Sequence, residues 1–122
     1  MAAVHTRDTG AEKAVRSIVH RLGYRYSLTR SDLPGKPDLA FVGRRKVIFV
    51  HGCFWHGHSC RYGSLPKSRL DYWQPKVAAN KARDRRQVAR LRRTGWSVMV
   101  IWQCQLKRKG PLEVRIRRFL DE

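Results

Sequence analysis

One segment of this 122-residue chain constrains its fold more than any other. Residues 52–73 are rich in Gly, His, Cys and aromatic side chains and show no apolar periodicity, which is uncommon inside a small domain and usually functional. The segment contains Cys53, His58 and Cys60 in the spacing C-x4-H-x-C, and Cys104 follows a distant apolar run. Three thiolates and an imidazole complete a tetrahedral zinc shell with no open position for water. The sequence therefore predicts a structural Zn²⁺ site that ties this segment to the rest of the domain; unligated buried cysteines are the alternative.

The apolar patterns around this segment predict a single domain over residues 1–122, because a chain of this length has room for one core. Residues 24–28 alternate weakly, as a short strand would. The other expected elements have a clear apolar pattern and are, in order, a helix at 11–22, strands at 38–42 and 46–50, a helix at 75–93, a strand at 96–102 and a helix within 111–122. This order predicts an α/β fold with a small mixed β-sheet flanked by helices.

The first two strong strands form a predicted β-hairpin with a three-residue loop at 43–45, which places Asp38 opposite Val50 and beside His51. Hydrolysis of a phosphodiester needs a cation on the phosphoryl oxygens and an activated water. Asp38 is a hard ligand suited to Mg²⁺, and either His51 or His56 can accept a proton from water. Taken singly, a turn aspartate and a hydrogen-bonded histidine are the simpler interpretations.

Charge indicates the partner. Lys and Arg total 27 against 9 Asp and Glu, a formal net charge of +18. So basic a domain favours a polyanion, and nucleic acid is the natural one, although a merely basic surface or a ribosome-type packing protein remains the alternative. No apolar stretch approaches the roughly 20 residues that cross a bilayer, and the first residues lack the apolar core of a secretion signal. We therefore expect no membrane association and a soluble cytoplasmic protein.

Aromatic side chains cluster in the same aperiodic segment. Phe54 and Trp55 are adjacent within it, and Trp73 lies at its end, near basic residues. Aromatic rings in such surroundings stack on bases or wedge between base steps, whereas core packing is the usual alternative. A zinc-tethered loop rich in Gly and His favours exposure, while Trp96 and Trp102 in the last strand are assigned to the core.

The run His51-Gly-Cys-Phe-Trp-His56, continued by Gly57-His58-Ser59-Cys60, closely resembles the very-short-patch repair endonucleases. Five further landmarks lie in the order of that family, at residues 9–12, 33–38, 83–86, 95–96 and 100–104. The resemblance covers about residues 8–106. It implies a fold similar to the type II restriction endonucleases and an enzyme of the bacterial cell interior, near the nucleoid. The implied substrate and partner is double-stranded DNA, and the enzyme would nick it 5′ to the thymine of a T·G mismatch. The resemblance also implies a monomer that acts alongside mismatch-repair proteins.

The resemblance also implies the catalytic roles. Asp38 and the backbone carbonyl of Val50 hold Mg²⁺, and Glu12 bonds metal-bound water. Glu12 also fits a capping box that opens the first helix, and the two roles are compatible. His56 is the implied general base, with Asp84 orienting its ring.

Further implied roles concern the phosphate, the base stack and the zinc. His51 assists at the scissile phosphate. Phe54, Trp55 and Trp73 form a wedge that opens the base stack beside the mismatch. The structural zinc ligands are Cys53, His58, Cys60 and Cys104.

Two departures from the family pattern keep other functions open. Val50 stands where the best-known pattern has threonine, which matters only if the hydroxyl, rather than the carbonyl, is needed. The arm before residue 8 is short, so a nicking relative with little mismatch preference remains an alternative. A non-catalytic zinc-bearing DNA-binding module is another, but such a module would have little reason to keep Asp38, His51 and His56.

Overall fold

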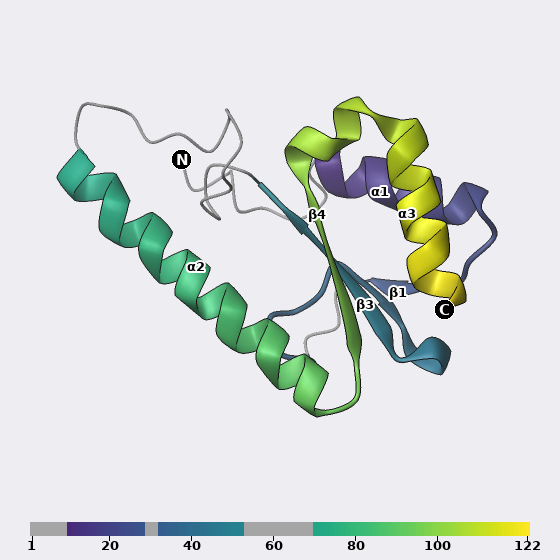
Figure 1. The fold of residues 1–122 in the computed structure, drawn as a ribbon, viewed down its shortest axis with the longest axis horizontal. Helices are drawn as coiled ribbons and strands as arrows, with labels where there is room; N and C mark the ends of the chain where they lie inside the picture. The colour runs from purple at the N-terminus through teal and green to yellow at the C-terminus, as the bar shows by residue number, and fades with distance from the viewer. Residues whose placement is uncertain (1–9, 29–31, 53–69) are drawn as a thin grey trace.

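The computed structural model describes residues 10–28, 32–52 and 70–122. Helices cover both faces of one sheet: α1 and α3 lie on one side and α2 on the other (Figure 1). The helices are α1 (Gly10–Arg21), α2 (Leu70–Arg93) and α3 (Lys109–Asp121), with short 3-10 helices η2 (Val42–Arg44) and η4 (Gln103–Lys107). The strands are β1 (Ser27–Leu28), β2 (Leu39–Phe41), β3 (Lys46–His51) and β4 (Ser97–Trp102). The predicted α/β fold with helices around a small sheet is confirmed.

The sheet is mixed, as predicted. Its four strands lie in the order β1-β2-β3-β4. The pairs β1–β2 and β2–β3 are antiparallel, whereas β3 and β4 are parallel. Parallel neighbours need a crossover connection, and α2 lies within that connection. The carboxyl ends of β3 and β4 therefore meet at one edge, with His51 paired to Trp102.

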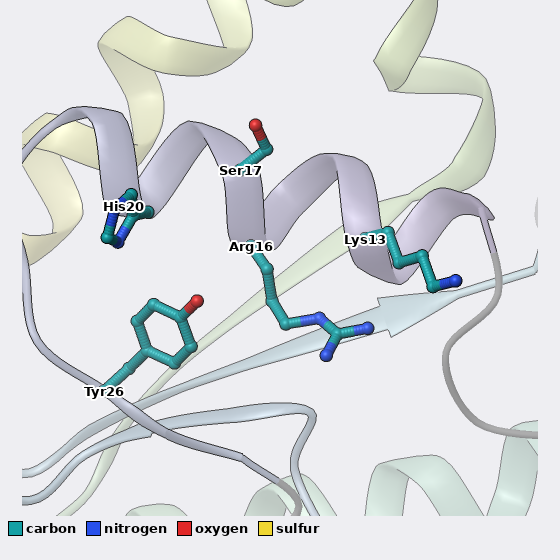
Figure 2. Close-up of a pocket in the computed structure, with 5 residues that line it drawn as sticks. All are labelled: Lys13, Arg16, Ser17, His20 and Tyr26. Carbon is teal, nitrogen blue, oxygen red and sulfur yellow. The ribbon is translucent and has the colours of Figure 1, made fainter.

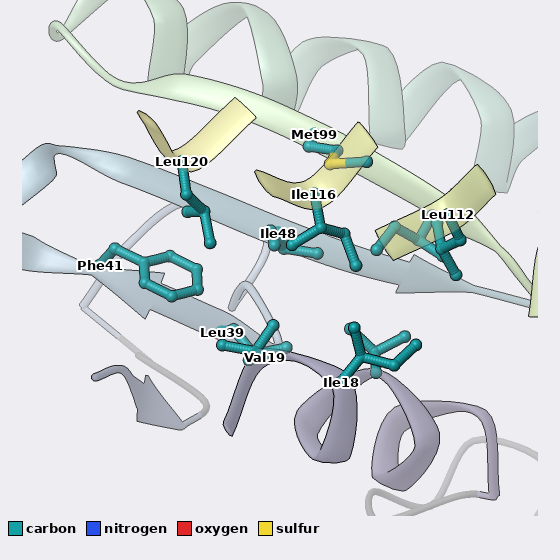
Figure 3. Close-up of a cluster of buried hydrophobic side chains, with 11 residues drawn as sticks. Ile18, Val19, Leu39, Phe41, Ile48, Met99, Leu112, Ile116 and Leu120 are labelled. Carbon is teal, nitrogen blue, oxygen red and sulfur yellow. The ribbon is translucent and has the colours of Figure 1, made fainter. Parts of the chain in front are cut away.

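The larger core lies between the sheet and the layer of α1 and α3, whose side chains meet over the strands (Figure 3). The apolar positions recur at helical spacing, so each helix presents one stripe to the sheet. The buried members are Val15, Ile18, Val19, Leu39, Phe41, Ile48, Met99, Ile101, Leu112, Ile116 and Leu120. Burying each large side chain contributes about 1.5–3 kcal/mol, which makes this cluster the main source of stability.

The opposite face of the sheet packs on a narrow stripe of α2. Leu91 is fully buried against the strands, Val88 is half-buried beside it, and Val77 is buried further toward the start of the helix. Apolar spacing predicts all three on this side. The rest of α2 is cationic, with eight exposed basic side chains: Lys76, Lys81, Arg83, Arg85, Arg86, Arg90, Arg92 and Arg93. Among the described residues, no helix is long and apolar enough to span a membrane.

The hairpin loop differs from its prediction by one residue. Phe41, rather than Val42, pairs with Lys46, so the loop has four residues, 42–45, and not three. Val42 begins the 3-10 turn, and the backbone N–H of Arg45 donates to the carbonyl of Val42 over 3.1 Å. Arg45 closes the turn with φ at 54°, in the left-handed region. Gly and Asn adopt this conformation much more readily than arginine does, so the sequence pattern did not predict it here.

The same turn anchors the end of α3. Lys46 is a charged residue of which only 7% is exposed, and its amine donates to the backbone oxygens of Phe119 and Glu122. Arg44 donates to the carbonyl of Leu120 over 2.8 Å. The last carbonyls of a helix have no partner within it and carry partial negative charge, so these two cations stabilise the end of α3.

The start of α2 also differs from its prediction. The sequence predicts a helix that begins at Pro75, a residue suited to a first turn, but the helix extends back to Leu70. Proline cannot donate the helical hydrogen bond to the preceding turn, yet it is tolerated this near the helix start. Trp73 consequently lies in the first turn of α2 and not in a loop. The predicted end is confirmed: the helix stops at Arg93, and Gly95 follows with φ at 93°.

A tight turn that leads to Asp38 packs beneath α2 at Gly35. Its φ is +78°, and an added Cβ would lie 2.8 Å from Oε1 of Gln87 and 3.0 Å from Cε1 of Phe49. We expect Gly35→Ala to lower the free energy of unfolding by about 1–3 kcal/mol, because the left-handed backbone and the crowding both oppose a side chain. Urea unfolding measures the change. Gly43→Ala is the matched control, since a Cβ there meets nothing within 4 Å, and equal losses of stability in both variants would contradict this explanation.

Candidate active site

Asp38 precedes β2 and lies across from the end of β3. Its half-buried carboxylate accepts a hydrogen bond from the backbone N–H of Val50, with Oδ2 2.6 Å from the nitrogen. With Phe41 paired to Lys46, an extended ladder would put Asp38 opposite Phe49, so the predicted pairing of Asp38 with Val50 is wrong by one residue. The predicted proximity is confirmed for another reason: the side chain reaches across to the Val50 amide.

His51 is the last residue of β3, and only 7% of it is exposed. Its ring lies between two aromatic rings, with centroids 5.5 Å from Phe49 and 5.2 Å from Trp102. These contacts restrict the rotation of the imidazole. The strand pattern predicts Trp102 in the core, but the residue is half-buried and belongs to this site, because the parallel register pairs it with His51.

A cavity of about 320 Å³ opens between this end of the sheet and α2. The strands contribute His51, Val100 and Trp102 to its wall, and α2 contributes Lys81, Asp84, Arg85, Val88, Ala89 and Arg92. Three cations against one carboxylate give this groove, named here the α2 groove, a positive potential that attracts phosphate. Sequence reasoning predicted the cations of α2 only as one general surface and missed those that face the site. Their helical spacing with Val88, at 81, 85, 88 and 92, was the available signal.

Asp84 reaches the site from α2. It lines the same cavity as His51 and lies 4.0 Å from the guanidinium of Arg83. His56, whose ring it was predicted to orient, lies outside the described residues, so that role stays a prediction. Glu12 is half-buried in the first turn of α1, and α1 contacts β3 and η4. Within residues 10–28, 32–52 and 70–122, no three His, Cys, Asp or Glu side chains are grouped so as to hold a metal ion.

Of the four predicted zinc ligands, only Cys104 lies among the residues that the structure describes. Cys104 is half-buried in η4, directly after β4. The other three ligands and two members of the predicted wedge fall outside the described residues: Cys53, His58, Cys60, Phe54 and Trp55. The third wedge residue, Trp73, packs edge to face against Tyr72, with ring centroids 4.9 Å apart. The zinc shell and the wedge both stay predictions.

Comparisons with known proteins identify relatives over most of the chain. A family described as DNA mismatch endonuclease Vsr matches residues 1–62. The type II nicking enzyme V.XorIIP of Xanthomonas oryzae pv. oryzae is 60% identical over 121 residues, which cover 99% of this chain and 89% of the relative. The DNA mismatch endonuclease Vsr of Escherichia coli K12 is 40% identical over 112 residues, covering 92% of this chain and 72% of that enzyme.

A solved structure supports the fold separately. The catalytic domain of the homing endonuclease I-Bth0305I superposes with a TM-score of 0.64 over 92% of this chain and 94% of that domain. At 17% sequence identity the likeness concerns the fold alone, and it agrees with the predicted endonuclease-like sheet. With the family match and the identities above, the chain belongs to the Vsr family of DNA mismatch endonucleases.

Proposed function

We propose that this protein nicks one strand of double-stranded DNA 5′ to the thymine of a T·G mismatch, by Mg²⁺-dependent hydrolysis of a phosphodiester. The observation that carries the proposal is the Asp38 carboxylate held on the amide of Val50, the residue directly before the buried His51, which lines a cationic groove. The names of two relatives support it: one is a DNA mismatch endonuclease and the other a nicking enzyme.

The donor set at Asp38 fits Mg²⁺. An ionised carboxylate offers about four lone-pair positions, so the bond from Val50 does not exhaust its capacity to bind a metal. Mg²⁺ prefers oxygen ligands and commonly takes only one or two carboxylates. The backbone carbonyl of Val50 is the proposed second ligand, for which valine serves as well as threonine. When bound, the ion would polarise a phosphoryl oxygen and make a coordinated water more acidic.

The side chains around the proposed metal site divide the remaining work. His51 lines the wall of the groove, and we assign to it a hydrogen bond donated to the scissile phosphate. We assign proton abstraction from the attacking water to His56, the orientation of its ring to Asp84, and a hydrogen bond to metal-bound water to Glu12. Lys81, Arg85 and Arg92, which line the groove, would hold neighbouring phosphates of the strand.

A structural zinc ion is the second proposed metal. An added Cβ at Gly52 would lie 3.8 Å from Oε1 of Gln103, so the residue before Cys53 is next to the residue before Cys104. This adjacency fits one shell shared by Cys104 with Cys53, His58 and Cys60. Because all four positions would be filled by protein, the ion would tie these positions of the chain together rather than take part in hydrolysis.

Opening of the base stack is assigned to aromatic residues. Phe54 and Trp55 directly follow the proposed zinc ligand Cys53 in the sequence, and Trp73 lies in the first turn of α2, next to Tyr72. Insertion of a ring costs a few kcal/mol of base stacking, and a mispaired step resists insertion least. The wedge would therefore favour a mismatch over a paired site.

The test of specificity compares three matched duplexes: a T·G mismatch, its T·A parent and a different mismatch, each with Mg²⁺ and mapped on a sequencing gel. We expect one nick, 5′ to the thymine, on the T·G duplex, and nicking of the T·A parent slower by about 100-fold, since opening a paired step costs a few kcal/mol more. Equal nicking of all three duplexes would contradict mismatch specificity and leave a less selective nicking enzyme.

A further inference from the structure

A second cationic cavity lies on α1, at a distance in sequence from every residue of the α2 groove. Lys13, Arg16, Ser17, His20 and Tyr26 line this open cavity of about 480 Å³, named here the α1 cavity (Figure 2). The four helical residues follow the spacing i, i+3, i+4 and i+7, so they lie on one side of the helix. None of the described residues that line it is acidic.

The lining offers hydrogen-bond donors as well as charge. Tyr26 is half-buried, and its ring packs edge to face against Phe41 of the main core, with centroids 6.3 Å apart. This contact fixes the ring, and Figure 2 shows its hydroxyl pointing toward α1 between His20 and Arg16. Hydroxyl, guanidinium and ammonium groups all donate to oxyanions, and the charged donors do so most strongly. The chemistry of the cavity therefore suits a phosphate group.

The position of α1 relates this cavity to the catalytic end of the sheet. The helix contacts β3 and η4, and Figure 1 shows its start beside η4. Lys13 directly follows Glu12, and the stripe from Lys13 to His20 extends about 10 Å along the helix at 1.5 Å per residue. That length equals the rise of about three nucleotides along one DNA strand, at 3.4 Å each. The stripe is thus long enough to contact more than one phosphate of a backbone that passes this end of the sheet.

We propose that the α1 cavity binds backbone phosphates of the same DNA duplex whose scissile phosphate lies at Asp38 and His51. The inference rests on the proposed function for the place of the scissile phosphate. Because α1 and α2 cover opposite faces of the sheet (Figure 1), the duplex is held by cations on both sides of the catalytic edge. The α1 contacts carry no base information, so they add affinity for DNA of any sequence and make binding more sensitive to salt.

The test measures binding without cleavage. Fluorescence anisotropy without Mg²⁺ and without chelator gives the Kd of the full chain for a labelled T·G duplex between 50 and 200 mM salt. In the double variant Lys13→Gln with Arg16→Gln, we expect the slope of log K against log salt to be shallower by about 1.8, at 0.9 for each phosphate that is no longer neutralised. Over that range, wild-type affinity then falls about ten-fold further than that of the variant. The matched control is Arg115→Gln with Arg118→Gln, two exposed cations at the same spacing on α3, which should keep the wild-type slope.

Other outcomes would overturn the inference. Equal slopes and equal Kd values in the α1 variant and the α3 control would do so. Titration with inorganic phosphate alone tests the other source of this chemistry: tight binding that is absent in the α1 variant would assign the cavity to a small free anion. Because Arg16 is half-buried, Lys13→Glu, which changes only an exposed side chain, repeats the test if the double variant does not fold. Since binding is measured without Mg²⁺, nicking is measured in a separate experiment, and a failure to nick DNA would not alter these results.

Discussion

Replacing Asp38 with asparagine is expected to lower the single-turnover nicking rate on a T·G duplex by about 1,000-fold, the equivalent of about 4 kcal/mol of transition-state stabilisation. The amide oxygen of asparagine can still accept the hydrogen bond from the Val50 N–H, so the local geometry should persist. What disappears is the negative charge, and a neutral amide holds Mg²⁺ much less firmly than a carboxylate does. The rate therefore falls because the metal site is weakened and not because the site unfolds.

Two controls separate this effect from a general one. Asp71→Asn removes a carboxylate of the same kind from an exposed position in the first turn of α2, and its nicking rate should stay within about two-fold of wild type. Thermal unfolding should show that Asp38→Asn has nearly the wild-type midpoint. If the Asp38 variant kept more than about a tenth of the wild-type rate, Asp38 would not be the main metal ligand.

Cys104→Ser is expected to have the largest effect on stability. Structural zinc sites have apparent binding free energies of about 10–16 kcal/mol, and part of this stabilises the fold when the ligands come from separate elements. With one proposed ligand in η4 and three proposed at residues 53–60, removal of the Cys104 thiolate should release the ion and lower the thermal midpoint by more than about 10 °C. Metal analysis of the purified protein should fall from one zinc per chain to nearly none.

The neighbouring Gln103→Ser variant controls for a change at this place in the chain. Gln103 is exposed and is not a proposed zinc ligand, so this variant should keep one zinc per chain and the wild-type midpoint of thermal unfolding. A Cys104 variant that retains stoichiometric zinc would remove Cys104 from the shell. A wild-type protein that contains no zinc and unfolds at the same temperature with and without chelator would contradict the zinc site altogether.

Local patterns were enough to predict most of the fold. The stripes of α1 and α3, the apolar run of β4 and the stop at Gly95 all depend on residues close in sequence. The two errors arose where local signals mislead. Arg45 adopts a left-handed backbone conformation, which in hairpin loops is usually adopted by glycine. The loop therefore has one residue more than predicted, and the hairpin register differs from the prediction by one residue. Pro75 suits a first helical turn, but the helix continues through it to Leu70.

The site was predictable only in part, because half of it depends on packing between distant elements. The run that contains His51 and the hairpin that holds Asp38 are local, so both were found. Asp84 was implied only by the family resemblance. The inclusion of Lys81 depends on how α2 is rotated about its axis, and basic residues surround that helix on several sides. The strand pattern of Trp102 predicts a core position, whereas its contact with His51 follows from a parallel register that no local signal encodes.

The most direct test of the central claim measures DNA binding and nicking of one T·G duplex by the wild-type protein, in parallel samples with Mg²⁺ and with no added Mg²⁺, both without chelator so that the proposed zinc is not removed. We predict binding in both samples and a single-strand nick only with Mg²⁺, because we expect the cations of the α2 groove to hold the DNA and Asp38 to act through the ion. Full binding with no nick in Mg²⁺ would contradict the claim and leave a DNA-binding module, and an equal nick without Mg²⁺ would contradict the Mg²⁺-dependent chemistry.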